Sequence, residues 1–191
     1  MKAVRSRTVA RLSLAVGTII VTLTPTACAN VHAPDATTVP YVDLTRYAGT
    51  WYEMARLPLW FQRHCIDSKA TYTYRNGTIH VNNECVTTSG ELETAQGVAT
   101  VVDTRTNARL NVVFDNWFSR TFGSSYHGNY WILHLDPDYR TAIVGTPDHR
   151  HVWILARTPH LDEPTYQQLV GIAQRLGYRT EDLIRDRRTS S

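Results

Sequence analysis

Apolar and polar residues alternate in short runs over most of the chain after residue 46. The runs are rich in Val, Tyr, Trp and Thr, which favour extended strands, and turn residues separate them at short, regular intervals. This pattern predicts eight strands, at residues 51–57, 69–74, 78–83, 92–103, 108–115, 129–135, 139–145 and 151–157. Such a succession of short strands predicts an all-β fold, either an antiparallel barrel or a sandwich.

One segment near the C-terminus has the period of a helix instead. Asp162 is a suitable N-cap, and Pro164 in the first turn favours a helix start. Apolar residues then recur at helical spacing from Tyr166 to Leu176, and a glycine follows as a stop signal. We expect a helix over residues 162–176 to pack its single apolar stripe against the outside of the strands.

The first 27 residues are typical of an export signal. Four basic residues precede an uncharged run at residues 12–23, and small residues follow the run. The run is shorter than the ~20 apolar residues that a membrane-spanning helix needs. We therefore divide the chain into a signal at 1–27, a tether at 28–40, a folded domain at 41–185 and a flexible tail at 186–191.

Two cleavage sites compete after this signal. Thr26-Ala27-Cys28 resembles a bacterial lipobox, in which Cys28 is lipidated and becomes the first residue of a membrane-anchored protein, although Pro25 stands where that motif usually has Leu. Ala27-Cys28-Ala29 also matches the A-x-A site of ordinary signal peptidase, and cleavage there would leave a soluble protein. We favour the lipoprotein, because Cys28 has no obvious partner once the other two cysteines pair.

The charge balance changes once this segment is set apart. It carries four of the 20 basic residues and none of the 17 acidic ones, so the folded part is close to neutral. Binding of nucleic acid requires a clustered basic surface. The composition therefore argues against a nucleic-acid partner.

The two remaining cysteines flank Asn76-Gly77, which is a strong signal for a two-residue hairpin turn. Antiparallel strands joined at this turn would bring Cys65 and Cys85 close together, and export to an oxidising compartment would join them in a disulfide. Two buried free thiols remain an alternative. A metal site has less support, because no CxxC or HxxxH spacing accompanies the cysteines.

Three motifs carry a resemblance to a known family. Residues 47–53, YAGTWYE, resemble the G-x-W motif that opens the first strand of the lipocalins, and 136–139 (DPDY) and 153–158 (WILART) are similar to their second and third motifs. Residues 49–56 with 153–159 resemble the bacterial lipocalins, relatives of apolipoprotein D. The resemblance covers nearly all of 40–185. It implies an eight-stranded antiparallel up-and-down β-barrel with one C-terminal helix packed outside.

In such a barrel the first and eighth strands are neighbours. Trp51 and Arg157 would then stack as a cation–π pair worth about 0.5–2 kcal/mol, and together with Gly49 they would have a structural role at one closed end. The resemblance also implies an open end, with the first loop as a flap over the ligand entrance. Trp60 and Phe61 in this loop would contact a hydrophobic ligand or a membrane, or they would fold back and be buried.

Alternation counted from Trp51 along the first strand, and alignment of the other strands to the lipocalin pattern, imply which side chains face the cavity. With the two loop aromatics, the predicted ligand-binding residues are Ala55, Trp60, Phe61, Tyr72, Tyr74, Val81, Asn83, Val112, Phe114, Tyr130, Ile132, His151 and Trp153. For residues 139–145 it is left open which side chains face the cavity and which face outward. The mixture is mostly apolar with a few polar groups, which suits an amphiphile such as a fatty acid or a lysophospholipid. Tyr, Asn or His near the mouth would meet its head group.

Two functions remain open at this stage. The favoured one is a non-enzymatic lipid carrier, anchored in the outer membrane and facing the periplasm, or else soluble and exported. The alternative is an isomerase or epoxidase that acts on a hydrophobic substrate inside the barrel. Glu53, expected near the closed end, with His134 or His151 would supply its acid and base, although a structural Glu53 is favoured. No phosphate loop, catalytic elbow or metalloprotease motif occurs, so we expect no cofactor and no metal. A homodimer is left open.

Overall fold

The computed structural model describes residues 37–115 and 127–187. The predicted export signal, Cys28 and most of the predicted tether lie outside the described residues, as do the last four residues of the chain. Neither α-helix in the described ranges is long and apolar enough to cross a membrane.

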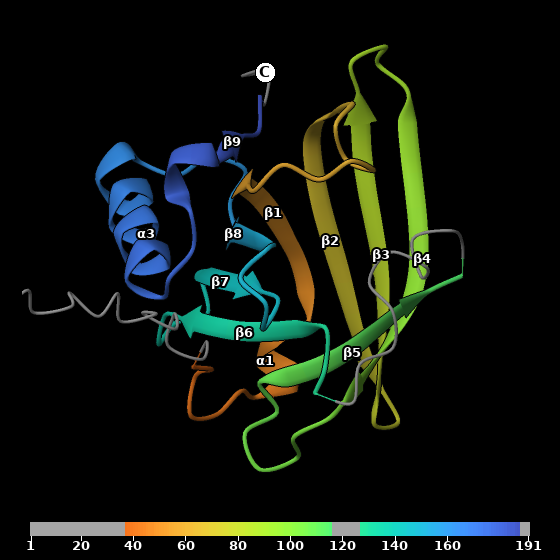
Figure 1. Ribbon diagram of the computed structural model, residues 1–191. Coiled ribbons are helices and arrows are strands. Elements are labelled where there is room, and N and C mark those ends of the chain that lie inside the picture. The colour runs from red at the N-terminus through yellow and green to blue at the C-terminus, as the bar shows by residue number, and fades with distance from the viewer. Residues whose placement is uncertain (1–36, 116–126, 188–191) are drawn as a thin grey trace, which may run out of the picture. The chain divides into compact units, whose positions relative to one another are not determined.

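The described strands form one antiparallel sheet that closes on itself (Figure 1). From β1 to β8 each strand pairs with the next in sequence, and β1 pairs with both β8 and β2. The strands are β1 (Gly49–Arg56), β2 (Cys65–Arg75), β3 (Thr78–Thr87), β4 (Leu92–Val101), β5 (Arg109–Phe114), β6 (Tyr130–Leu135), β7 (Thr141–Gly145) and β8 (Val152–Ala156), with the two-residue β9 (Ile184–Arg185) at the end of β1. The predicted eight-stranded up-and-down barrel is therefore confirmed.

The predicted helix is also confirmed, as α3 (Glu163–Arg175). The Asp162 carboxylate accepts a hydrogen bond from the Thr165 amide at 2.8 Å and so caps its N-terminus. Its apolar stripe is buried against the outside of the barrel beside β8 (Figure 1). Two short helices, α1 (Leu44–Tyr47) and η1 (Thr180–Asp182), precede β1 and β9.

The apolar side chains of the barrel form two clusters, one inside the barrel and one on its outer face. Alternation along each strand decides which cluster a side chain joins. On β8, Trp153 and Leu155 belong to the cluster inside the barrel, whereas Ile154 belongs to the cluster beneath α3. On β6, Ile132 faces inward and Trp131 outward, as alternation predicts. The structure also settles β7, whose parity was left open: Ala142 and Val144 are inside and Ile143 is outside.

A β-bulge in β1 makes the prediction for Ala55 wrong. The pairing of β1 with β8 shifts register between Glu53 and Ala55. A bulge adds one residue and so interrupts strict alternation. Met54 and Ala55 consequently both join the outer cluster, and Arg56, the cross-strand partner of inward-facing Trp153, takes the inward position. A second shift in β6, between Ile132 and His134, places Leu135 rather than His134 against the inner cluster.

The closed end of the barrel is sealed as the motifs implied. The Arg157 guanidinium carbon lies 4.0 Å from the centre of the fully buried Trp51 ring. Arg157 also donates hydrogen bonds to a ring of main-chain carbonyls, those of Arg46, Tyr47, Ala48, Thr50 and Tyr139. Gly49 has a φ of +100°, and a Cβ there would lie 3.0 Å from Arg157 Nη1, so glycine is required for this approach.

Replacing Arg157 by Lys should therefore lower the free energy of unfolding by about 2–4 kcal/mol, because an ammonium group leaves several of these carbonyls without a donor. Urea denaturation would measure the loss. The matched control is Arg140→Lys, which changes an exposed side chain and should alter stability by less than about 0.5 kcal/mol. Equal losses in the two variants would show that the hydrogen bonds from Arg157 to the main-chain carbonyls contribute little to stability.

The predicted disulfide between Cys65 and Cys85 is present, with the two Cα atoms 5.6 Å apart. It joins β2 to β3 across a sequence separation of 20 residues. Replacing both cysteines by Ala should lower the free energy of unfolding by about 3 kcal/mol, since the cross-link restricts the unfolded chain. Reduction of the unmodified protein should reproduce this loss and should leave the double variant unchanged. A double variant as stable as the oxidised protein would contradict the prediction.

Candidate functional site

Within the described part of the chain, the barrel surrounds a large cavity that is open at one end. The space between its walls measures about 1000 Å³, including the solvent at its mouth. Most of its wall is apolar, as in pockets that hold small hydrophobic molecules. The predicted ligand-binding residues that line it are Phe61, Tyr72, Val81, Asn83, Val112, Phe114, Tyr130 and Trp153.

The other predicted residues do not line this cavity. Tyr74 is 38% exposed near the turn at the far end of β2, beyond the cavity floor. Ile132 is fully buried within the inner cluster, and half-buried His151 lies beside Trp153 with the ring centres 6.2 Å apart. Ala55 is on the outer face because of the bulge in β1.

The two aromatics of the first loop have different surroundings. Phe61 is buried and forms part of the cavity wall. Trp60 is 61% exposed and contacts Phe61 edge-on, with the ring centres 5.8 Å apart. Phe61 therefore folds back into the barrel, whereas Trp60 remains exposed on the loop.

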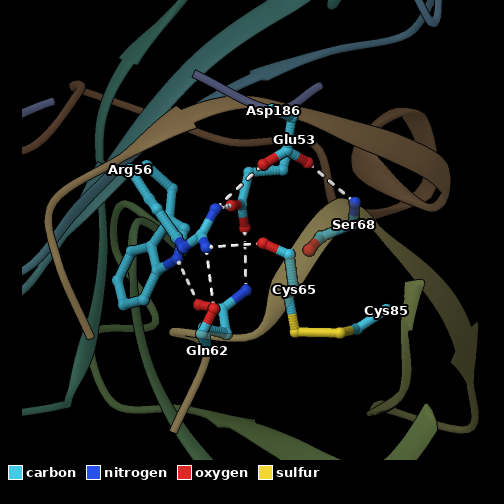
Figure 2. Close-up of polar contacts among 8 residues, drawn as sticks. Glu53, Arg56, Gln62, Cys65, Ser68, Cys85 and Asp186 are labelled. Carbon is cyan, nitrogen blue, oxygen red and sulfur yellow. Dashed lines mark hydrogen bonds and ion pairs between the residues drawn. A yellow bond between two sulfur atoms is a disulfide. The ribbon is translucent and has the colours of Figure 1, made fainter. Parts of the chain in front are cut away.

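A buried ionic network joins the first loop to the barrel near the mouth (Figure 2). Arg56, only 2% exposed, donates to Glu53 and to Asp186, both at 2.9 Å. Its other nitrogen donates to the carbonyls of Gln62 and Cys65 at 2.8 and 3.1 Å. Asp186 comes from the C-terminal segment, so a single guanidinium ties that segment, β1 and the first loop together.

Glu53 lies on the mouth side of the cavity, which corrects its expected place near the closed end. Its second oxygen accepts a hydrogen bond from the Gln62 side chain at 3.1 Å, and Gln62 belongs to the loop at the open end. Both carboxylate oxygens are thus engaged, one by Arg56 and one by Gln62. The structural role favoured for Glu53 agrees with these contacts. Alternation alone had missed Arg56, because the bulge that turns it inward has no signature in the sequence.

Two pairs of opposite charge lie near β2, β3 and β4. Lys69 lies 2.6 Å from Glu84, its cross-strand partner, on the outer face of the sheet, because the neighbouring Ala70 faces inward. The hydrogen bond that Lys69 donates to Glu84 raises the pKa of Lys69, so the ammonium group stays charged. At the mouth, His64 lies 2.9 Å from Glu93, which lines the cavity.

Three tyrosine hydroxyls meet at the deep end of the cavity, beside the seal. The Tyr130 hydroxyl lies 2.8 Å from that of Tyr47 and 3.0 Å from that of Tyr72. Tyr47 packs on Trp51 with the ring centres 5.1 Å apart. Tyr72 and Tyr130 are therefore not among the residues near the mouth that could meet a head group there, because their strand positions are level with the closed end.

The grouping of metal-ligand types in the described part of the chain comprises His64, Cys65 and Cys85. The two sulfur atoms are bonded to each other, so they are not the thiolates that bind zinc. These three residues therefore do not form a metal-binding set in the oxidised protein.

Comparison with known proteins identifies the family. A model described as a lipocalin-like domain matches residues 42–188. The chain is 39% identical over 142 residues to temperature-induced lipocalin-1 of Arabidopsis thaliana, covering 72% of this chain and 74% of the relative. It is 37% identical over 161 residues to the outer membrane lipoprotein Blc of Citrobacter freundii, covering 83% and 86%. Bovine (Bos taurus) apolipoprotein D is 32% identical and covers 68% of each chain.

Solved structures agree at the level of the fold. Lobster apocrustacyanin A1 superposes with a TM-score of 0.59 at 14% identity, covering 76% of this chain and 79% of that one. Insecticyanin from the tobacco hornworm Manduca sexta gives 0.57 at 19% identity, with 83% and 87% covered. The closed barrel, the sealed end with its Trp51–Arg157 pair and the matching family model together establish that this chain belongs to the lipocalin family.

Proposed function

We propose that this lipocalin binds and carries single-chain amphiphiles, such as fatty acids or lysophospholipids, in the bacterial cell envelope. The observation that carries the proposal is the apolar cavity, open at one end and walled by Phe61, Phe114, Trp153 and aliphatic side chains. Burying an acyl chain there would contribute about 0.8 kcal/mol for each methylene group removed from water.

Polar groups near the mouth would meet the head group of such a ligand. Gln62 and Glu93 line the cavity there, and His64 lies 2.9 Å from Glu93. A charged head group held among these residues would stay near water, so its charge would not be buried. The chain of the ligand would then point toward the closed end.

The enzymatic alternative receives no support from the cavity. The Glu53 carboxylate is held by Arg56 and Gln62, and His134 does not line the cavity. A general base must reach the proton that it removes from the substrate. We therefore propose a carrier without catalytic residues.

The envelope location rests on the sequence and on the relatives. Several similar proteins are outer membrane lipoproteins, among them the Blc proteins of Citrobacter freundii and Escherichia coli. The lipobox-like Thr26-Ala27-Cys28 of this chain supports the same location. We propose that Cys28 carries the anchor.

Truncating the indole on the cavity wall should weaken ligand binding. Trp153→Ala should lower the affinity for a fatty acid by about 1–3 kcal/mol, the usual contribution of a large buried side chain. Trp131→Ala is the control, since Trp131 packs in the outer cluster beneath α3. It should cost stability and leave the affinity of folded protein nearly unchanged. Displacement of a fluorescent fatty acid would measure both, and a loss confined to Trp131→Ala would contradict the proposed site.

The anchor has a direct test by intact mass. Protein isolated from bacterial membranes should begin at Cys28 and carry two acyl chains there, because one chain alone binds a membrane only weakly. The matched variant Cys28→Ser should lose the modification and leave the membrane fraction. An unmodified chain that begins at Asn30 would show that ordinary signal peptidase cleaves the protein.

A further inference from the structure

The deep end of the cavity has an unused hydrogen-bond donor. The hydroxyls of Tyr47, Tyr130 and Tyr72 form a row in which Tyr130 is the middle member. Tyr72 and Tyr130 line the cavity, whereas Tyr47 lies behind them against Trp51. We call these three residues the tyrosine floor.

Counting protons shows why one donor is left over. Each phenol has one O–H group, and the row contains two contacts between hydroxyls, which use two of the three protons. The three hydroxyls make no other hydrogen bond to the described chain. The row has three possible orientations, because Tyr130 can donate only once. In two of them the spare O–H is on Tyr72 or Tyr130 and is available to a molecule in the cavity, and a bound acceptor favours these two over the third, in which it is on Tyr47.

The protonation of the three phenols is secure at ordinary pH. Burial raises the pKa of Tyr72 to about 12, and it raises the pKa of Tyr47 and of Tyr130 well above the usual value. The floor consequently offers a neutral O–H donor and no phenolate.

The surroundings of the floor select a neutral partner for this donor. The nearest cation, Arg157, stacks on Trp51 and is occupied by main-chain carbonyls. A carboxylate or phosphate placed at the floor would be buried without a counter-charge, which is strongly unfavourable. A keto, ester or hydroxyl oxygen would accept the hydrogen bond without that cost.

We propose that the tyrosine floor selects amphiphiles that carry a neutral acceptor oxygen at the end that enters the cavity first. The inference rests on the proposed function, because it names which amphiphiles the same cavity prefers. The charged head group stays at the mouth near water, and the oxygenated end of the chain reaches Tyr72 and Tyr130. The preferred ligand class is therefore an oxygenated acyl chain with polar groups at both ends.

The test compares saturated fatty acids with the same acids bearing a keto group next to the terminal methyl. A series of chain lengths is used, so that one member places the keto oxygen at the floor. For that length the unmodified protein should bind the keto acid about 2- to 10-fold more tightly than the plain acid, the range expected for one net hydrogen bond.

Removing the donors should reverse the preference. In Tyr72→Phe/Tyr130→Phe the two cavity-lining hydroxyls are lost with almost no change in shape. The keto acid should then bind more weakly than the plain acid, because its carbonyl is buried without a partner. Tyr74→Phe is the control, since this partly exposed tyrosine of β2 does not line the cavity, and it should keep the original preference.

A measurement on the unmodified protein keeps the proposal testable if the double variant does not fold. The infrared band of an isotopically labelled keto carbonyl should lie at lower frequency in the complex than in a hydrocarbon solvent. A band at the hydrocarbon position would overturn the proposal.

The outcomes also separate this inference from the proposed function. Equal affinities for keto and plain acids at every length would overturn the selection by the tyrosine floor and leave the carrier function intact. A preference that persists unchanged in Tyr72→Phe/Tyr130→Phe would also overturn it. Failure of the unmodified protein to bind any acid of either series would overturn both proposals.

Discussion

The pairing of β1 on both of its edges is the constraint on which the rest of the structure depends. Trp51 of β1 is paired with Ala70 of β2, and two residues later Glu53 is paired with Leu155 of β8. Because the first and last strands are hydrogen-bonded along most of β1, the sheet has an inside, and residues of one parity are removed from water together. The cavity, the sealed end and the outer face beneath α3 all follow from this closure.

The same strand carries the irregularity that shapes the mouth. The bulge after Glu53 sends Met54 and Ala55 to the outer cluster and turns Arg56 inward. A buried guanidinium is tolerated only with partners. Arg56 pairs with Glu53 and Asp186, and it donates hydrogen bonds to two main-chain carbonyls between β1 and the start of β2. One extra residue in β1 thereby connects the entrance loop and the C-terminal segment to the wall of the cavity.

Polarity inside the barrel is concentrated at its two ends. Gln62 and Glu93 stand at the mouth, the hydroxyls of Tyr72 and Tyr130 stand at the floor, and apolar side chains such as Val112 separate them. Such a cavity matches an elongated molecule better than a compact one. Its apolar middle supplies affinity, and the hydrogen-bonding groups at the ends supply discrimination.

The sequence by itself determined the strands, the hairpin with its disulfide, the outer helix and the Trp51–Arg157 seal. These features depend on local patterns: alternation, a two-residue turn, helical spacing and short motifs. Only the tertiary structure decided the direction of Ala55, the network around Arg56 and the depth of Tyr72 and Tyr130. Bulges and cross-barrel contacts arise from pairing between distant strands, and alternation along one strand contains no information about that register.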